Sequence, residues 1–306
     1  MAARTSLPVQ PPEASTVLQV QGIDINGWKI RTVKSSILTS DEGEAWREAL
    51  GLPELPEMVF GGARVQFVHS SGAIVTFKAF DALAMVDNQA QPPMVAASAT
   101  WMQTASTEKA QDSVDAFDWT YNTAYGGTTG MLVEPSKELK VKPVEVKVQP
   151  VPENDAADNI TPGDGDGPGV FVAVPAPVPP AKSIDYDLLR KREPILFFDE
   201  VMFFEDELAD HGSSTLVAKL RVMPSAFFCL LRQFIRVDGV VVAVNDTRLF
   251  HAFGTSRVIR RITSATAECA ALEAANPTIT PAFYADVEAV IPLLTTTRDE
   301  TEVLEL

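Results

Sequence analysis

The stretch FFEDELADHG places four carboxylates and a histidine directly behind two phenylalanines. Carboxylate oxygens bind divalent metal ions, and paired carboxylates act as acid and base across a substrate. Glu205, Glu207 and His211 would share a face if a strand continued through the stretch, whereas Asp206 and Asp210 would share one if it turned helical. Neither spacing is that of a known ligand set, and acidic residues that close a strand are usually solvated. We therefore favour a strand end, and keep as the alternative a metal-dependent hydrolase that uses Glu205, Glu207, Asp210 and His211.

Other catalytic signatures are missing from the sequence. The three histidines, His69, His211 and His251, lie far apart, and none has a His-x-x-x-His or Cys-x-x-Cys companion. The nucleophile elbow G-x-S-x-G, the P-loop and G-x-G-x-x-G do not occur. GDGDGPG lacks the spaced ligands and the closing glutamate of an EF-hand. We expect a protein that is not an enzyme, with no cofactor and no metal.

Composition and charge argue against further classes. The 306 residues are 46% hydrophobic, enough for a sizeable core, and 25 Lys and Arg stand against 41 Asp and Glu, a net charge of −16. Such a field repels nucleic acid and anionic lipid surfaces. The N-terminus has no apolar signal-peptide core, and the longest apolar runs are too short to span a bilayer. Cys229 and Cys269 fit reduced thiols better than a secreted disulfide framework. We predict a monomeric protein of the cytoplasm, or also of the nucleus, that binds neither nucleic acid nor membrane.

Proline and glycine divide the chain. Residues 1–22 are rich in Pro, Ser and Gln and are predicted as a disordered leader. Residues 136–181 contain many prolines and the glycine-rich stretch GDGDGPG, and this range is predicted as a flexible insert. The last residues, 295–306, are predicted as an acidic tail. The flanks 23–135 and 182–294 are then two domains joined by a linker or one interrupted domain, and the pattern slightly favours one because neither flank looks self-sufficient.

Local signals in the first flank predict a helix and a hairpin. TSDE, which starts at Thr39, is a capping box, and Gly51 ends the helix that follows it. RVQFVH and AIVTFKA are apolar and partly alternating, with SSG between them, which is typical of a β-hairpin. Asp81 is predicted to cap a short helix, DALAMVD. Two further strands are predicted near 95–98 and 119–125.

The second flank is predicted to carry long strands. IDYDLLRKR is predicted as a helix that ends before Pro194, and ILFFDEVMFFEDEL and STLVAKLRVM as strands. SAFFCLLRQFIRV has apolar residues at helical spacing and is predicted as a helix. VVVAV and RLFHAF are predicted as a hairpin with its turn at Asn245-Asp246-Thr247. Strands and helices without a regular alternation indicate an α+β fold.

Several phrases, taken together, resemble one known family. LPEMVFG and DWTYNTAYGGT in the first flank, and IDYDLLRKREPILFF, FFEDELADHG, KLRVMPSAFF and RVDGVVVAVNDTRLFH in the second, resemble the Tip-forty-one-like family of type 2A protein phosphatase regulators in TOR signalling. The phrases span both flanks in order, so the resemblance indicates one domain interrupted by a long disordered insert. It implies an α+β protein with an antiparallel β-sheet core, surrounding helices and no catalytic activity. It also implies binding to catalytic subunits of type 2A-like phosphatases, near the active site and the C-terminal tail, with inhibition as the expected effect.

The same resemblance implies binding residues. Positions that match Asp81, Ile184, Val244 and Asp246 belong to the family's phosphatase-binding surface, and the family usually carries methionine where this chain has Val244. The rim of that surface is expected at Glu205, Asp206, Asn245 and Arg248. Loops that present such side chains from a rigid scaffold make a binding face, whereas the alternative is that these phrases are only turns and caps. A scaffold that recruits partners through the disordered insert is the third functional alternative.

Overall fold

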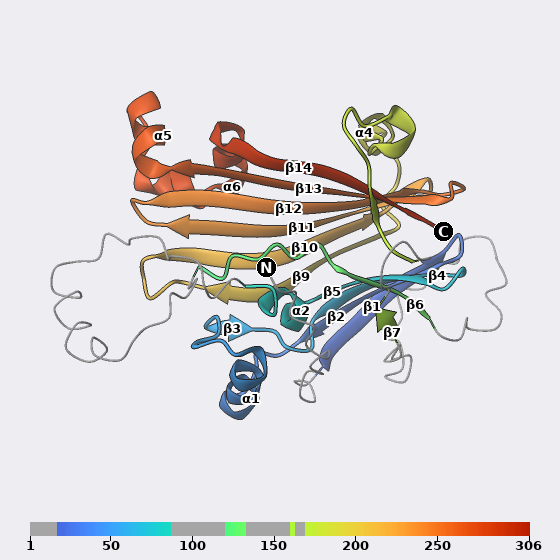
Figure 1. Ribbon diagram of the computed structural model, residues 1–306, viewed down its shortest axis with the longest axis horizontal. Helices are drawn as coiled ribbons and strands as arrows, with labels where there is room; N and C mark the ends of the chain where they lie inside the picture. The colour runs from blue at the N-terminus through green and yellow to red at the C-terminus, as the bar shows by residue number, and fades with distance from the viewer. Residues whose placement is uncertain (1–16, 87–119, 133–159, 163–168) are drawn as a thin grey trace.

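The computed structural model describes residues 17–86, 120–132, 160–162 and 169–306, and these ranges contain two antiparallel β-sheets (Figure 1). The first sheet has six strands in the order β1-β2-β4-β5-β6-β7. Its strands are β1 (Val17–Ile25), β2 (Trp28–Ser35), β4 (Arg64–His69), β5 (Ala73–Lys78), β6 (Thr128–Leu132) and β7 (Ile160–Pro162). The β4–β5 hairpin confirms the prediction from RVQFVH and AIVTFKA.

The second sheet has eight strands in the order β3-β9-β10-β11-β12-β13-β14-β8. Its strands are β3 (Met58–Val59), β9 (Phe197–Asp206), β10 (Gly212–Val222), β11 (Ala226–Val237), β12 (Val241–Ala252), β13 (Arg257–Glu268), β14 (Thr295–Glu305) and β8 (Val172–Ala173). From β9 to β13 each strand pairs antiparallel with the next one along the chain. The second half of the chain is therefore a meander, and the predicted α+β fold with an antiparallel sheet core is confirmed.

Helices are short and lie around the sheets. They are α1 (Ser40–Leu50), α2 (Ala79–Leu83), α4 (Tyr186–Arg190), α5 (Cys269–Ala275) and α6 (Val287–Val290), with 3-10 turns η1 (Pro180–Lys182), η2 (Pro281–Ala285) and η3 (Ile291–Leu293). The Thr39 side chain accepts from the Glu42 N–H, the Glu42 side chain binds the Thr39 N–H, and Gly51 ends α1 in the left-handed region, as predicted. No helix in the described ranges has the length and apolar character needed to cross a bilayer.

The main core lies between the two sheets. Phe67 of β4 stacks on Phe227 of β11 with ring centroids 4.9 Å apart, and the Trp28 ring meets Phe227 edge-on at 5.1 Å. These rings are almost fully buried, and burial of each stabilises the fold by about 1.5–3 kcal/mol. A polar link adds to the packing, because the Asp199 carboxylate of β9 accepts from Thr32 Oγ1 and pairs with the Lys34 ammonium of β2. The two flanks of the chain thus form one folded unit.

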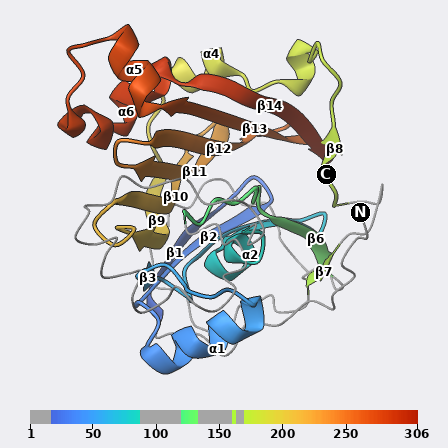
Figure 2. The same cartoon turned by 60° about the vertical axis from the view of Figure 1, so that its left-hand side comes forward.

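The other face of the eight-stranded sheet, here called the outer face, is covered at both ends. At one end Val244 and Phe234 pack with Val290 of α6 and Leu272 of α5. At the other end Ile184 packs with Phe250, Met223 and Val303, and Leu188 of α4 lies against this cluster. Figure 2 shows α4, α5 and α6 on the side of this sheet that faces away from the six-stranded sheet. The inner face meets the main core and the loop 120–125.

Two secondary-structure predictions in the second flank are wrong. SAFFCLLRQFIRV forms β11 and not a helix, because both faces of this strand are apolar and helical spacing then arises without a helix. Asn245-Asp246-Thr247 lies inside the continuous strand β12 and makes no turn. The turn before β12 uses Gly239, which has φ +69°, in the left-handed region that glycine favours.

Several predicted boundaries also differ from the structure. Residues 17–22 belong to β1 and so are not part of a disordered leader. Residues 295–306 form the core strand β14 and not an acidic tail, because Val303 and Leu304 are buried. Within the predicted insert, 160–162 and 169–181 contribute β7, β8 and the buried Phe171, while the rest of 136–181 lies outside the described residues.

The region around residue 120 differs as well. The predicted strand at 119–125 is irregular over the described residues 120–125, with one isolated bridge between Thr123 and Val86. The predicted strand at 95–98 lies outside the described residues. Asp81 sits inside α2, which starts at Ala79, so it does not cap the helix.

Candidate partner-binding site

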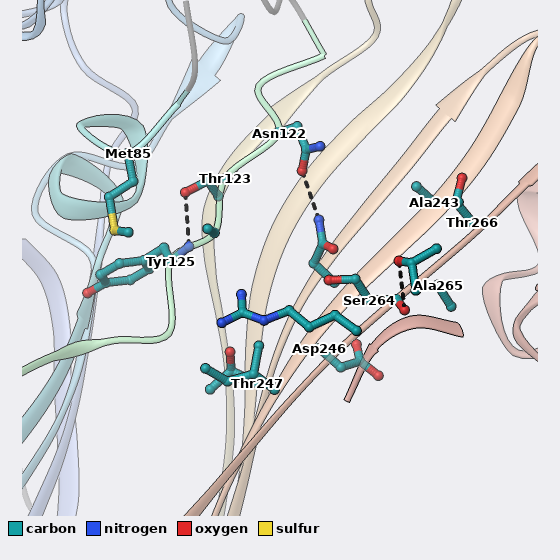
Figure 3. Close-up of a pocket in the computed structure, with 15 residues that line it drawn as sticks. Met85, Asn122, Thr123, Tyr125, Ala243, Asp246, Thr247, Ser264, Ala265 and Thr266 are labelled. Atoms are coloured by element: carbon teal, nitrogen blue, oxygen red, sulfur yellow. Dashed lines mark hydrogen bonds between the residues drawn. The ribbon is translucent and has the colours of Figure 1, made fainter. Parts of the chain in front are cut away.

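A pocket of about 460 Å³ opens on the inner face of the eight-stranded sheet, between β12–β14 and the loop 122–125. Figure 3 shows Met85, Thr123 and Tyr125 on one side, with Ala243, Ser264 and Thr266 on the other. The pocket is lined by Met85, Asn122, Thr123, Ala124, Tyr125, Ala243, Asn245, Asp246, Thr247, Ile262, Ser264, Ala265, Thr266, Thr297 and Arg298. Small and polar side chains line most of this pocket, so it can hold a chain that offers hydrogen-bonding groups.

One buried glutamine fixes the loop wall of the pocket. Gln233 of β11 is 1% exposed, its Oε1 accepts from the Thr123 N–H at 3.1 Å, and its Nε2 donates to the Tyr121 carbonyl. Asn245 Nδ2 donates to Gln233 Oε1 at 3.2 Å and to Asn122 Oδ1 at 2.8 Å. The irregular backbone of the loop is thereby satisfied by side chains of the sheet.

Tyr125 connects the pocket to the first sheet. Its hydroxyl donates to the Thr76 carbonyl at 3.0 Å and accepts from the Lys78 N–H at 3.1 Å. Burial raises the pKa of the Tyr125 phenol, and the nearby carboxylate of Asp81 raises it further. Asp81 itself accepts a hydrogen bond from Thr128 Oγ1. Asp81 therefore supports the wall of the pocket and does not line it.

Arg298 supplies charge at the β14 side of the pocket. Its guanidinium pairs with Glu300 at 2.6 Å, and both side chains are at least one-third exposed. Such an exposed pair contributes little to stability and can exchange for another anion. The pocket therefore has a cation at one side and two amide side chains, Asn122 and Asn245, at the other.

Asp246 faces away from this pocket, although its backbone lines it. Alternation along β12 turns its carboxylate to the outer face, where it is 2% exposed. Arg232 donates to it through Nε at 2.7 Å and Nη2 at 2.9 Å, and Arg248 donates through Nη2 at 2.6 Å. Burial opposes the charge of Arg232, but its hydrogen bonds to Asp246 and Glu288 raise the pKa of that guanidinium. Asp246 is the buried centre of a charged network.

The four residues assigned by resemblance do not form one surface. Ile184 and Val244 are 5% and 4% exposed, in the two apolar clusters at opposite ends of the outer face. Asp246 lies on the same outer face, in the charged network with Arg232 and Arg248. Asp81 lies near Tyr125, on the side of the pocket. None of Ile184, Val244 and Asp246 presents a well-exposed side chain to a partner.

The four predicted rim residues are also divided between faces. Glu205 lines a second hollow of about 540 Å³ on the outer face, and Arg248 lies on that face beside Asp246. Asn245 lines the inner pocket. Asp206 is buried and accepts from the backbone N–H groups of Glu57 and Leu208. Asn245 is therefore the member of this set that reaches the pocket with its side chain.

The acidic stretch behind Phe203 and Phe204 ends a strand, as the favoured interpretation predicts. Both rings are fully buried and β9 ends at Asp206. Leu208, Ala209 and Asp210 all have positive φ and make the turn into β10. Burial raises the pKa of Asp206 despite its two backbone hydrogen bonds. Across the described ranges no three His, Cys, Asp or Glu side chains are grouped as metal ligands would be.

The sequence contains signals for Asn122, which lines the pocket, and for Gln233, which holds the loop wall of the pocket. Asn122 lies inside DWTYNTAYGGT, one of the sequence motifs that carry the family resemblance. Gln233 is an uncharged polar residue in the apolar run AFFCLLRQFI, and a polar side chain in such a run needs a buried partner. The sequence did not indicate a role for Arg298 in the pocket, because residues 295–306 were predicted as an acidic tail.

Comparisons with known proteins identify the family. The model of the TIP41-like family matches residues 58–273. A TIP41-like protein of Rattus norvegicus is 35% identical over 260 residues, which cover 85% of this chain and 82% of the relative. A TIP41-like protein of Arabidopsis thaliana is 34% identical over 291 residues, 94% of this chain and 91% of the relative. The type 2A phosphatase activator TIP41 of Saccharomyces cerevisiae is 33% identical over 273 residues, 83% of this chain and 65% of the relative. This chain belongs to the TIP41-like family.

Proposed function

We propose that this protein is a non-enzymatic regulator that binds the catalytic subunits of type 2A-like serine/threonine phosphatases directly and modulates their activity in TOR signalling. The observation that carries the proposal is membership of a family whose relatives in Saccharomyces cerevisiae and Schizosaccharomyces pombe are named type 2A phosphatase activators. We propose inhibition in the bound state, since a protein that covers a surface near an active site blocks substrates. The names of the yeast relatives point to activation, so a phosphatase assay on the complex is part of the test.

The inner pocket is the proposed docking site. Asn122 and Asn245 offer amide groups that can pair with a main chain, and Arg298 offers a cation that can exchange Glu300 for an acidic group of the partner. The loop wall is fixed by Gln233, so little ordering is needed when a partner binds. A preformed polar pocket of this kind favours recognition of an extended segment.

The residues assigned by resemblance take supporting roles in this proposal. Asp246 positions the guanidinium groups of Arg232 and Arg248 on the outer face. Val244 anchors α5 and α6, and Ile184 anchors the segment that leads to α4. Asp81 supports the pocket through its neighbour Tyr125. Their substitution would then weaken binding by disturbing the scaffold that presents the contact residues.

Filling the pocket tests the proposal. Ser264→Phe places a ring in the pocket from the inner face of β13, whereas Thr296→Phe, on β14, adds the same ring at an exposed position that does not line it. We expect Ser264→Phe to weaken capture of a recombinant type 2A-like catalytic subunit by about tenfold or more, and Thr296→Phe to bind as the wild type does. Both variants should unfold at the temperature of the wild type. Unchanged capture by Ser264→Phe would remove the pocket from the interface, and no capture by the wild type would refute direct binding.

Compartment and assembly follow from the same proposal. Cys229 and Cys269 are buried free thiols, which suits a reducing compartment such as the cytoplasm, where the proposed partners are expected. We propose that the protein is monomeric until it binds the phosphatase. Size-exclusion chromatography with light scattering, on the free chain and on the mixture, measures both states.

A further inference from the structure

The outer face of β9 and β10 carries an uncovered surface that mixes cations with apolar side chains. Phe198 of β9 lies opposite Arg221 of β10, and Arg221 lies opposite Phe228 of β11, so the guanidinium stands between two phenylalanines. Phe198 and Ile195 are each 56% exposed, more than any other large hydrophobic residue in the described part of the chain. Large apolar side chains that stay exposed beside a guanidinium can serve as contacts for a partner.

Arg221 has no carboxylate partner within the described residues. Its Nη2 donates a long hydrogen bond of 3.4 Å to the Leu189 carbonyl, and its Nε is buried without an acceptor. Most other arginines are neutralised by a nearby carboxylate. Such pairs are formed by Arg31, Arg232, Arg248, Arg257, Arg260 and Arg261. A half-buried guanidinium without an anion can bind one by donating its N–H groups to the anion's oxygens.

Two further cations lie in the segment that runs beside Arg221. Leu196 donates its N–H to the Val222 carbonyl at 2.8 Å, and the Glu193 carboxylate accepts from Ser225 Oγ at 2.6 Å, which holds residues 189–196 along the end of β10. Lys191 and Arg192 in this segment are exposed, and across the described ranges neither forms an ion pair. Lys219 lies two residues before Arg221 on the same face of β10, and its ammonium has a long 3.5 Å contact with the Glu200 carboxylate. We call Lys191, Arg192, Ile195, Phe198, Lys219 and Arg221 the cationic patch.

We propose that the cationic patch is a second docking surface, separate from the inner pocket, for an acidic segment of a partner protein that carries at least one large apolar side chain. A carboxylate of that segment binds the Arg221 guanidinium in the forked geometry that arginine favours, and the apolar side chain packs on Phe198 and Ile195. Lys191 and Arg192 raise the association rate of an acidic segment. Within the described residues, Lys191, Arg192 and Arg221 form no ion pair, and the net charge of the whole chain is −16, so the patch is a local cationic site that is complementary to an anion.

A short acidic segment fits this patch better than an anionic bilayer does. A bilayer is a broad plane, and the remaining acidic surface of the chain would approach it together with the patch. A peptide strand covers only the patch itself. The eight-stranded sheet separates the patch on its outer face from the pocket on its inner face, so two partners can bind at once.

A labelled peptide tests the chemistry of the patch. The probe is an extended peptide of about ten residues, roughly 30 Å long, in which glutamates flank one Leu-Phe pair. Its binding to the full chain is followed by fluorescence anisotropy, beside a Glu→Gln peptide and a peptide with alanine in place of the pair. We expect the probe to bind the wild type, and both altered peptides to bind about tenfold more weakly or not at all.

Variants of the chain locate the site. Lys191→Glu/Arg192→Glu changes two exposed loop residues, Arg221→Gln removes the half-buried charge, and Lys29→Glu on the six-stranded sheet is the matched control. We expect the first two variants to lose about tenfold in affinity for the probe and the control to keep it. Capture of the phosphatase catalytic subunit should be unchanged in Lys191→Glu/Arg192→Glu, because the pocket lies on the opposite face.

Several outcomes would overturn the proposal. Equal losses in Lys29→Glu and in the patch variants would show a general charge effect and no site. Binding of the probe that is unaffected by the patch variants would place it elsewhere. Sedimentation of the chain with phosphatidylserine vesicles, without binding of the peptide, would assign the patch to a lipid surface. Loss of phosphatase capture in Lys191→Glu/Arg192→Glu would show that the two surfaces are not separate, whereas failure of capture in every variant bears only on the proposed function.

Discussion

Asp246 of β12 and Arg232 of β11 lie directly opposite each other in the sheet and are joined by two hydrogen bonds, from Nε to Oδ1 and from Nη2 to Oδ2. Arg248 adds a third bond to the same carboxylate, and Glu288 of α6 binds the far side of Arg232. This network fills the outer face between the two apolar clusters. A residue expected in an exposed turn is therefore the buried anion that holds two cations in place.

Replacement of Asp246 is predicted to destabilise the fold. Asp246→Ala leaves two guanidinium groups close together without their anion, and breaking a buried pair in this way costs about 3–5 kcal/mol. We expect a loss of this size in the free energy of unfolding measured with urea. Asp299→Ala is the control, because Asp299 pairs with Arg261 on the same face but is 45% exposed, and its loss should stay below about 1 kcal/mol. Similar losses in the two variants would contradict the assigned role of burial.

Gln233 is predicted to control the order of the pocket wall. Gln233→Leu keeps the size of the side chain but leaves the Thr123 N–H and the Tyr121 carbonyl without this partner. A buried polar group that loses its hydrogen bond costs about 1–3 kcal/mol of stability. The loop 120–125 should therefore open locally more often in Gln233→Leu than in the wild type, while the sheet stays closed. We expect faster hydrogen exchange at residues 120–125, weaker phosphatase capture and little change in β10. The same exchange rates in wild type and Gln233→Leu would refute this role, and Gln66→Leu on β4 serves as the control.

Leu304 is predicted to be a core residue of the C-terminal strand. It is fully buried on the inner face of β14 and packs in the main core. Truncation to alanine in such a site removes contacts and leaves a cavity, which costs about 2–5 kcal/mol. Thermal unfolding of Leu304→Ala should shift down accordingly, while Glu300→Ala on the exposed part of the strand should unfold as the wild type does. A stable Leu304→Ala would restore the interpretation of this segment as a tail.

The strand β9, which has one apolar and one polar face, could be predicted from the sequence, whereas the strand β11, which has two apolar faces, could not. In β9 the inward Phe197 and Val201 alternate with exposed Phe198 and Glu200, so the pattern indicated a strand. In β11 the outer face is apolar too because α5, α6 and the segment before α4 cover its ends. The elements that cover the outer face of β11 come from distant parts of the chain, so the local sequence of β11 does not show that this face is buried.

The candidate site could not be predicted fully either, because it depends on which face of a strand each side chain occupies. Asn245 and Asp246 are neighbours in the sequence but point to opposite faces of β12, one into the pocket and one into the charged network. The sequence favours a turn at these residues because Asn and Asp are common in turns. Their partners, Asn122 and Arg232, come from other elements and replace the hydrogen bonds that a turn would supply. Which residue is exposed follows only when the strand and its partners are known.

His251 joins the two sheets through an aromatic cluster. Its ring centroid lies 5.1 Å from Trp28 and 5.7 Å from Phe253, and its Nδ1 donates to the Arg257 carbonyl at 2.8 Å. Burial lowers the pKa of His251, the bond to Arg257 opposes this in part, and the neighbouring His69 lowers it further. Burial lowers the pKa of His69 as well. The folded state therefore disfavours the protonated form of His251.

Stability is predicted to fall in mild acid because of His251. The unfolded chain takes up a proton on this histidine near its ordinary pKa of about 6.5, whereas the folded state takes it up only at lower pH. The unfolded state then binds more protons, so the stability contributed by neutral His251 is complete above about pH 6.5 and decreases as the pH falls below it. We expect the free energy of unfolding, measured with urea between about pH 7.5 and 5.5, to fall less steeply in His251→Phe than in the wild type. Equal slopes in His251→Phe and in the wild type would contradict the prediction.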